Sequence, residues 1–185
     1  MPYSNSIFVD TSALLAMVNS HDDYHDRVVD FMNNWKDKFP QYTNLATSDY
    51  VLSETITKIR FRISNDAALT FGKAVLNSKL LDIIYVDKEG FKEAWNIFYL
   101  IENANVKDHF IKNEDTTPIS DKNHHATLSY IDATILACIN LYNIPALFTF
   151  DQDFHYLSKH GILKDIGFLK NRNLQVYPVG IHYIP

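Results

Sequence analysis

Short apolar runs alternate with stretches of helical periodicity along most of this chain, and that alternation limits its fold more than any other feature. The apolar runs predict strands at residues 7–9, 44–48, 80–87, 146–150 and 174–179. Apolar residues at helical spacing predict helices at 11–18, 22–39, 49–63, 64–78, 88–102, 128–143 and 151–161. Strands that alternate with helices form βαβ units, so we expect an α/β fold with a mostly parallel central sheet.

The length of the chain suits one domain. With 185 residues, 46% of them hydrophobic, we expect a single globular domain over residues 1–185. The polar, aperiodic segment 103–127 is expected to be a long loop or insertion. No apolar run is long enough to cross a bilayer and no secretory leader precedes the first strand, so we expect a cytoplasmic protein with no membrane contact. The single cysteine, Cys138, lies in an apolar run and is expected in the core.

Four acidic residues are expected at one edge of the sheet. Asp10 ends the first strand, and Asp151 follows the apolar run ALFTF in the same way. Glu54 and Asp132 lie near the starts of two helices. Ligand sites in parallel sheets lie at the carboxyl ends of the strands, where the following helices begin. The four carboxylates can therefore converge on one cleft.

Each acid also has an ordinary structural explanation, as a helix cap or as half of an ion pair. These explanations are an N-cap for Asp10, an ion pair with Lys58 for Glu54, a capping box with Ser129 for Asp132, and an N-cap for Asp151 with Asp153 in the first turn. They account least well for Asp132, which has no cation three or four residues away in an apolar helix. Several carboxylates in one pocket repel one another unless a hard divalent cation, Mg²⁺ or Mn²⁺, compensates.

The segments FVDTSALLAMV, SDYVLSETITKI, LSYIDATILACI and IPALFTFDQDF resemble, in order and spacing, the four acidic motifs of PIN-domain ribonucleases. The resemblance is strongest to the VapC-like toxins of toxin–antitoxin pairs, and it extends over most of the chain. It implies a three-layer α/β/α fold in which Asp10, Glu54, Asp132 and Asp151 are both the catalytic and the metal-binding acids. Asp153 would be a further metal ligand and Ser12 a supporting residue. The long segment 103–127 departs from such toxins, which usually have a shorter connection there.

The resemblance also implies an activity and partners. The expected reaction is hydrolysis of RNA phosphodiester bonds with Mg²⁺ or Mn²⁺, because divalent ions held by carboxylates activate water and stabilise the leaving oxygen. A homodimer and a small antitoxin protein are the implied partners, beside the RNA substrate. The residues independently favour a dimer, because apolar side chains spread around the helix at 49–63: Val51, Leu52, Ile56, Ile59, Phe61 and Ile63.

Other functions remain open on the sequence. A non-catalytic PIN-like scaffold that binds RNA or protein, or a stand-alone RNA-processing nuclease, would use the same fold. The net charge of −5 is unusual for a general nucleic-acid binder. His21 and His25 have the spacing of the histidine pair in zinc peptidases. A phosphatase of the haloacid dehalogenase type would need an acid where Ser12 stands. A dinucleotide-binding domain is not indicated, because no glycine motif of that kind is present. Eight histidines would also allow a metal-free imidazole ribonuclease.

Several further residues could contact RNA or could be purely structural. Two basic clusters could bind phosphates or could face solvent: Lys58, Arg60 and Arg62 in one, and Lys170 and Arg172 in the other. Three aromatic residues flank the expected site and could be core or stacking residues: Tyr130, Phe148 and Phe150. His124 and His125 lie in the polar segment, where a solvent-exposed loop is the default.

Overall fold

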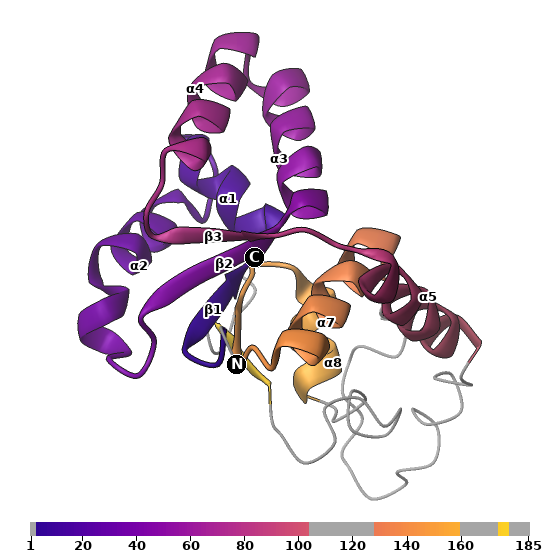
Figure 1. The fold of residues 1–185 in the computed structure, drawn as a ribbon. Helices are drawn as coiled ribbons and strands as arrows, with labels where there is room; N and C mark the ends of the chain where they lie inside the picture. Colours follow the sequence, from indigo (N-terminus) through magenta and orange to yellow (C-terminus); the bar gives the residue numbers. More distant parts are fainter. Residues whose placement is uncertain (1–2, 104–127, 160–173, 178–185) are drawn as a thin grey trace, which may run out of the picture.

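Five parallel strands form the centre of the molecule (Figure 1). The computed structural model describes residues 3–103, 128–159 and 174–177. Its strands are β1 (Ser6–Val9), β2 (Asn44–Ser48), β3 (Leu81–Ile84), β4 (Ala146–Phe148) and β5 (Gln175–Tyr177), in the order β3-β2-β1-β4-β5. Every strand pair in this sheet is parallel, which confirms the predicted α/β class.

Helices follow the strands as the alternation predicted. They are α1 (Thr11–Val18), α2 (His25–Lys38), α3 (Asp49–Arg62), α4 (Asn65–Leu76), α5 (Lys88–Asn103), α7 (Tyr130–Tyr142) and α8 (Gln152–Lys159). Polar side chains cap five of these helices at their N-termini: Asp10 for α1, Ser48 for α3, Ser64 for α4, Ser129 for α7 and Asp151 for α8. Four of the caps, at α1, α3, α7 and α8, begin helices that supply an expected site residue, so the caps also set where those residues lie.

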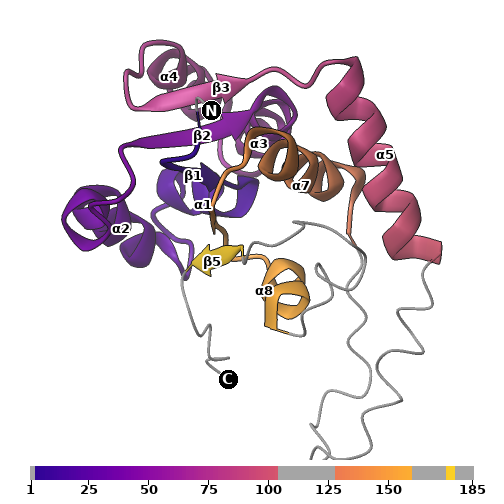
Figure 2. The same cartoon turned by 60° about the horizontal axis from the view of Figure 1, so that its bottom comes forward.

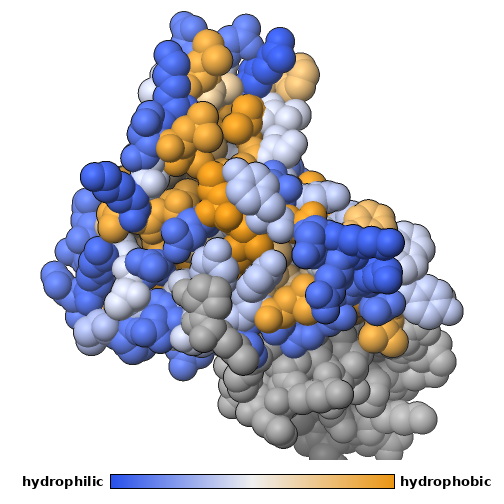
Figure 3. Space-filling model, in the orientation of Figure 1, coloured by the Kyte–Doolittle hydropathy of each residue, from blue (hydrophilic) through white to orange (hydrophobic). Residues whose placement is uncertain are grey.

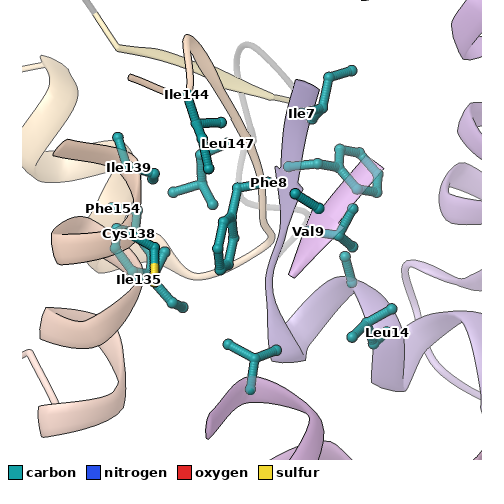
Figure 4. Packing of buried hydrophobic residues seen from close by; sticks show 14 of the residues in the cluster. Ile7, Phe8, Val9, Leu14, Ile135, Cys138, Ile139, Ile144, Leu147 and Phe154 are labelled. Atoms are coloured by element: carbon teal, nitrogen blue, oxygen red, sulfur yellow. The ribbon is translucent and has the colours of Figure 1, made fainter. Parts of the chain in front are cut away.

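Helices cover both faces of the sheet, in a three-layer α/β/α arrangement. Phe8 points from β1 toward Ile135 and Cys138 of α7 (Figure 4). Ile7 and Val9 point to the opposite face, because successive strand residues alternate. All five of these side chains are buried, and α5 packs alongside α7 (Figure 2). The buried Cys138 is thus the small core residue that the sequence predicted.

The pairing of β1 with β4 places two parts of the chain that are far apart in sequence side by side. Val9 is opposite Phe148 in the parallel register, and the Asp10 amide donates a hydrogen bond to the Phe148 carbonyl at 3.1 Å. Asp10 therefore lies next to Thr149, the first residue after β4. This register builds the centre of the candidate site.

Some predicted boundaries were wrong. The run ALFTF is a strand only as far as Phe148, so Asp151 lies three residues beyond the strand end rather than directly after it. Asn103 is the last residue of α5, not the first residue of a loop. Residues 104–127, Gly161, Lys170 and Arg172 lie outside the described residues, and the single domain over 1–185 stays a prediction. No described helix has the length and apolar character that a membrane span requires.

Candidate functional site

Asp10 is the most buried acid of the site, with 3% of its surface exposed. It sits where β1 ends and α1 begins, in extended backbone geometry, and its carboxylate accepts hydrogen bonds from the Thr11 and Ser12 amides. The predicted N-cap role is therefore confirmed. An N-cap uses only part of a carboxylate's capacity to accept hydrogen bonds, however. The second oxygen of Asp10 accepts further hydrogen bonds from side chains.

Two hydroxyl groups hold the second oxygen of Asp10. The Thr149 hydroxyl donates to Asp10 Oδ2 at 2.7 Å, and the Ser12 hydroxyl donates to the same oxygen at 2.8 Å. Ser12 Oγ in turn accepts the Phe150 amide at 2.9 Å, and Thr149 Oγ1 accepts the Asp151 amide at 2.9 Å. The carboxylate is thus fixed in one orientation by groups from two segments that are far apart in the sequence.

Burial raises the pKa of Asp10 above its ordinary value. Hydrogen bonds from Thr149, Ser12 and the Thr11 amide act in the opposite direction, and the charge of Asp151 raises the pKa further. A buried carboxylate surrounded by donors is held in place to be ionised when a cation binds to it. Among the residues that the structure describes, the main groups that set its pKa include no cationic side chain.

Asp132 is the acid whose protonation is most perturbed. Its carboxylate accepts the Ser129 amide at 2.7 Å while the Ser129 hydroxyl accepts the Asp132 amide at 3.2 Å, which confirms the predicted capping box. Burial nevertheless raises the pKa of Asp132 to about 7, and the charges of Asp10 and Asp151 contribute to the rise. A capping box alone would stabilise the ionised carboxylate, so the environment of Asp132 needs a further explanation.

Asp151 and Asp153 begin α8. Asp151 Oδ1 accepts the Asp153 amide at 2.8 Å, so Asp151 caps this helix as predicted. Burial raises the pKa of Asp151, the charge of Asp153 also raises it, and the nearby His155 and Lys58 lower it. Asp151 therefore lies near a lysine, Lys58, whose charge favours its ionised form.

Glu54 joins the site through Thr11 rather than through another acid. The Thr11 hydroxyl donates to Glu54 Oε2 at 2.6 Å, and Lys58 Nζ lies 2.8 Å from Glu54 Oε1. The ion pair with Lys58, one turn along α3, is the structural alternative that the sequence offered, and it is present. The same lysine is close enough to lower the pKa of Asp151, so Lys58 lies between two of the candidate ligands.

The structure brings Asp10, Asp132 and Asp151 within electrostatic reach of one another and links Glu54 to them through Thr11. Within the described part of the chain, no three acidic, histidine or cysteine side chains are close enough to enclose a metal ion as they stand. The donor set is nevertheless one that Mg²⁺ or Mn²⁺ prefers, because it consists of hard carboxylate oxygens. Asp151 raises the pKa of Asp10, and both raise the pKa of Asp132, so a divalent cation among them would lower all of these values.

The other candidates have mainly structural surroundings. His25 donates its Nδ1 proton to the Ala16 carbonyl at 2.8 Å, which ties the start of α2 to α1 and gives no support to a zinc-peptidase pair with His21. Phe148 and Phe150 are buried, so they are core residues rather than stacking surfaces. Tyr130 is only partly buried. The pair His124 and His125 lies outside the described residues.

Sequence reasoning missed three residues of the site, Thr11, Thr149 and His155. Thr149 read as one more residue of an apolar strand, and only the register between β1 and β4 shows that its hydroxyl binds Asp10. His155 Nε2 lies 3.1 Å from the Thr149 carbonyl, and burial lowers its pKa. For Thr149, the only signal in the sequence was a threonine at the end of a predicted strand, two residues before an acid. The sequence held no signal for His155.

The chain was compared with known families and structures. The sequence profile of the PIN domain family matches residues 7–159. Among solved structures, VapC20 from Mycobacterium tuberculosis, described as a sarcin-ricin loop cleaving toxin, is similar with a TM-score of 0.56 and 23% identity over 90% of this chain and 98% of that chain. VapBC2 from Rickettsia felis, bound to a DNA fragment from their promoter, has a TM-score of 0.53 and 14% identity over 92% of this chain and 98% of that chain. No curated protein matches the sequence at a significant level.

Proposed function

This chain belongs to the PIN domain family, and from that membership we propose that it is a metal-dependent endoribonuclease that hydrolyses RNA phosphodiester bonds. One observation carries the proposal. Asp10, Asp132 and Asp151 all have raised pKa values: Asp151 contributes to the rise at Asp10, both of these contribute at Asp132, and Asp153 contributes at Asp151. Such an arrangement is costly to the fold unless its charge is used to bind a cation.

Asp10, Asp132 and Asp151 would hold the metal, with Glu54 and Asp153 completing its surroundings. Mg²⁺ or Mn²⁺ bound there would supply an activated water and a stabilised leaving oxygen for phosphodiester hydrolysis. The hydroxyls of Ser12 and Thr149 orient Asp10, and the Ser129 amide orients Asp132.

Lys58 contributes positive charge beside Asp151, and it also pairs with Glu54. In the absence of metal this charge offsets part of the repulsion among the acids. In the presence of RNA, Lys58 would bind a phosphate next to the site. Burial lowers the pKa of His155 and so favours its neutral form, and its ring donates a hydrogen bond to the Thr149 carbonyl.

The test is digestion of an end-labelled RNA by the wild-type protein with Mg²⁺, with Mn²⁺ and with EDTA, in parallel with Asp132→Asn. We expect metal-dependent products with 5′-phosphate and 3′-hydroxyl ends, and no cleavage by the variant. Asp30→Asn is the matched control, because Asp30 is an exposed acid on α2 that pairs with Lys38, and it should cleave normally. Cyclic-phosphate products that persist in EDTA would instead indicate an imidazole mechanism and overturn the proposal.

A non-catalytic scaffold that binds RNA or protein is the second candidate, and a stand-alone RNA-processing nuclease is the third. RNA that is bound but left intact under every metal condition would favour the scaffold. The candidate site argues against it, because a scaffold has no use for a buried carboxylate such as Asp10 held by two hydroxyls.

We also propose that this nuclease is the toxin of a toxin–antitoxin pair, restrained by a small antitoxin protein in the cytoplasm. Support comes from the likeness to VapC20 and to VapBC2, both solved as members of such systems. A short open reading frame beside the gene, whose product copurifies with this chain and inhibits cleavage, would support the pairing. The absence of any such neighbour would favour the stand-alone nuclease.

The proposed homodimer would form through the hairpin of α3 and α4. Hydrophobic side chains gather along this hairpin, which projects from the sheet (Figures 1 and 3). Val51, Leu52 and Ile59 are buried as part of the core. Three apolar residues of α4 are also buried: Ala68, Phe71 and Val75. Five other large apolar residues of the hairpin are exposed: Ile56 and Phe61 on α3, Ile63 at its C-terminal end, and Leu69 and Leu76 on α4. A two-fold contact between two hairpins would bury this surface.

A further inference from the structure

A stripe of aromatic side chains extends from the rim of the candidate site along α5. Three of its members are Phe91, Trp95 and Tyr99, which follow one another at intervals of four residues and therefore lie on one face of the helix. They are 48%, 53% and 57% exposed, respectively. Two further members, Tyr130 on α7 and Tyr50 on α3, complete what we call the aromatic stripe.

Tyr130 connects the parts of the stripe. Its ring centroid is 5.5 Å from that of Phe91, 6.4 Å from that of Trp95 and 6.5 Å from that of Tyr50. Its hydroxyl donates to the Phe91 carbonyl at 3.2 Å, which fixes the ring against α5. The stripe is thus a continuous surface on three helices rather than a set of scattered exposed residues.

The stripe begins one helical turn from an acid of the candidate site. Tyr50 precedes Glu54 by four residues on α3, so the two side chains lie on one face of that helix. Tyr130 lies in the same first turn of α7 as Asp132, on another side of the helix. A strand of RNA whose scissile phosphate lies at the acids would therefore have its neighbouring nucleotides within reach of the start of the stripe. α5 then continues the surface away from the site alongside α7 (Figure 2).

Positive charge accompanies the rings on α5. Lys88 and Lys92 are exposed and lie three residues before Phe91 and Trp95, on the same side of the helix. The nearby Glu93 is turned to α7, where its carboxylate accepts the Asn140 amide at 2.7 Å. Rings that can stack on bases, next to ammonium groups that can bind phosphates, are the combination found where single-stranded nucleic acids bind.

We propose that the aromatic stripe binds unpaired bases of the RNA substrate, with Lys88 and Lys92 on its phosphates. This inference rests on the proposed nuclease function and adds to it the surface that would bind the nucleotides next to the cleaved bond. An apolar protein surface would suit this face less well, since it would bury the ammonium groups of Lys88 and Lys92 without a partner.

Tryptophan fluorescence can test the proposal without any cleavage. Of the two tryptophans, Trp35 is buried in the core and Trp95 is exposed, so base stacking on the stripe should quench Trp95. The Asp132→Asn protein would be titrated in Mg²⁺ with a single-stranded oligouridylate, with an abasic strand of the same length, and with a fully paired duplex. We expect quenching by the first strand and little by the other two.

Variants then assign the binding to the stripe. Trp95→Leu, in the same Asp132→Asn background and followed by polarisation of a labelled oligouridylate, should weaken binding about tenfold, because one stacked base contributes on that order. Lys88→Gln with Lys92→Gln should weaken binding and reduce its salt dependence. Phe61→Leu, which changes an exposed ring on α3 outside the stripe, should bind as the parent does.

Equal binding of the abasic and base-bearing strands would overturn the proposal. So would normal RNA binding by Trp95→Leu together with loss of a protein partner, which would identify the stripe as a protein-docking face. Wild-type cleavage is measured in parallel. Cleavage without base-dependent quenching would overturn the stripe alone, and base-dependent quenching without cleavage would overturn the nuclease alone.

Discussion

Thr149 is the residue on which the position of the Asp10 carboxylate most depends. We expect Thr149→Val to remove the hydroxyl that donates to Asp10 at 2.7 Å and that accepts the Asp151 amide. Both partners are close to the site, so cleavage should fall about 10- to 100-fold, as for other residues that orient metal ligands. The free energy of unfolding should fall by about 1–3 kcal/mol, because a buried carboxylate loses a donor.

Thr47→Val is the matched control. Thr47 is equally buried near the end of β2, and its hydroxyl donates to the Val9 carbonyl at 3.0 Å instead of to an acid. Urea unfolding should show a comparable loss of stability, while the cleavage rate per folded molecule stays unchanged. Equal losses of activity in the two variants would mean that Thr149 acts only through stability.

The raised pKa of Asp132 predicts how the stability of the metal-free protein depends on pH. The pKa of Asp132 is raised to about 7 in the folded protein, so the folded state retains a proton that the unfolded state has lost. In EDTA, the free energy of unfolding should therefore fall as pH rises from about 4 to about 7 and then level off. Asp10 and Asp151 contribute in the same direction, because their pKa values are raised as well.

Asp132→Asn should flatten that pH dependence and stabilise the metal-free protein by about 1–3 kcal/mol at pH 8. Each pKa unit corresponds to about 1.4 kcal/mol, and we reduce the resulting figure because Asp132 is partly exposed. Urea unfolding at several pH values in EDTA measures the change. Addition of Mn²⁺ should stabilise the wild type at pH 8 and stabilise the variant much less. A variant that is less stable than wild type at pH 8 would contradict the prediction.

At the scale of single residues, the sequence could supply the acids but not the groups that orient them. Asp10, Asp132 and Asp151 follow predicted strands or begin predicted helices, so the rule for parallel sheets brought them to one edge. The hydroxyls of Thr149 and Thr11 could not be found in the same way. Their contacts with Asp10 and Glu54 depend on the register of β1 against β4 and on the packing of α1 against α3, which periodicity does not contain.

At the scale of elements, the helix caps link stability to the site. Ser129→Ala should remove the hydroxyl of the capping box at α7 and lower the free energy of unfolding by about 1 kcal/mol. Because Asp132 belongs to the same first turn, cleavage should fall severalfold. Ser64→Ala removes the cap of α4, which supplies no residue of the site, and should lower stability equally without changing cleavage. Thermal unfolding and the RNA digest together separate the two effects.

The elements themselves followed from the sequence because each combines a clear period with clear end signals. Asn143, predicted to end α7, adopts the left-handed conformation that stops a helix. The strand at 146–150 was predicted too long because the run ALFTF is apolar throughout, whereas pairing with β1 and β5 ends at Phe148. An apolar run indicates that a segment is buried, but hydrogen bonding to the neighbouring strands decides where the strand ends.

At the scale of the whole molecule, the hairpin of α3 and α4 predicts self-association. Phe61 is 80% exposed on α3, and a two-fold contact would bury it. We expect the wild type to be dimeric by light scattering at about ten micromolar, in the range of ordinary protein affinities, and Phe61→Ser with Leu76→Ser to be monomeric. Val29→Ser, on the exposed side of α2, should leave the dimer intact. A wild type that is monomeric at that concentration would refute the hairpin as a dimer surface.

The position of β1 in the sheet has a consequence for when this protein can act. β1 precedes the other strands of the sheet, yet it lies at the centre and is completed only when β4 pairs with its free edge, well over a hundred residues later in the chain. A nascent chain that has left the ribosome as far as α5 contains Asp10 and Glu54 but lacks Asp132, Asp151 and the threonine that orients Asp10. Translation itself therefore delays the appearance of the acidic site until the segment with β4 and Asp151 has been made, and a product that ends before that segment lacks the site.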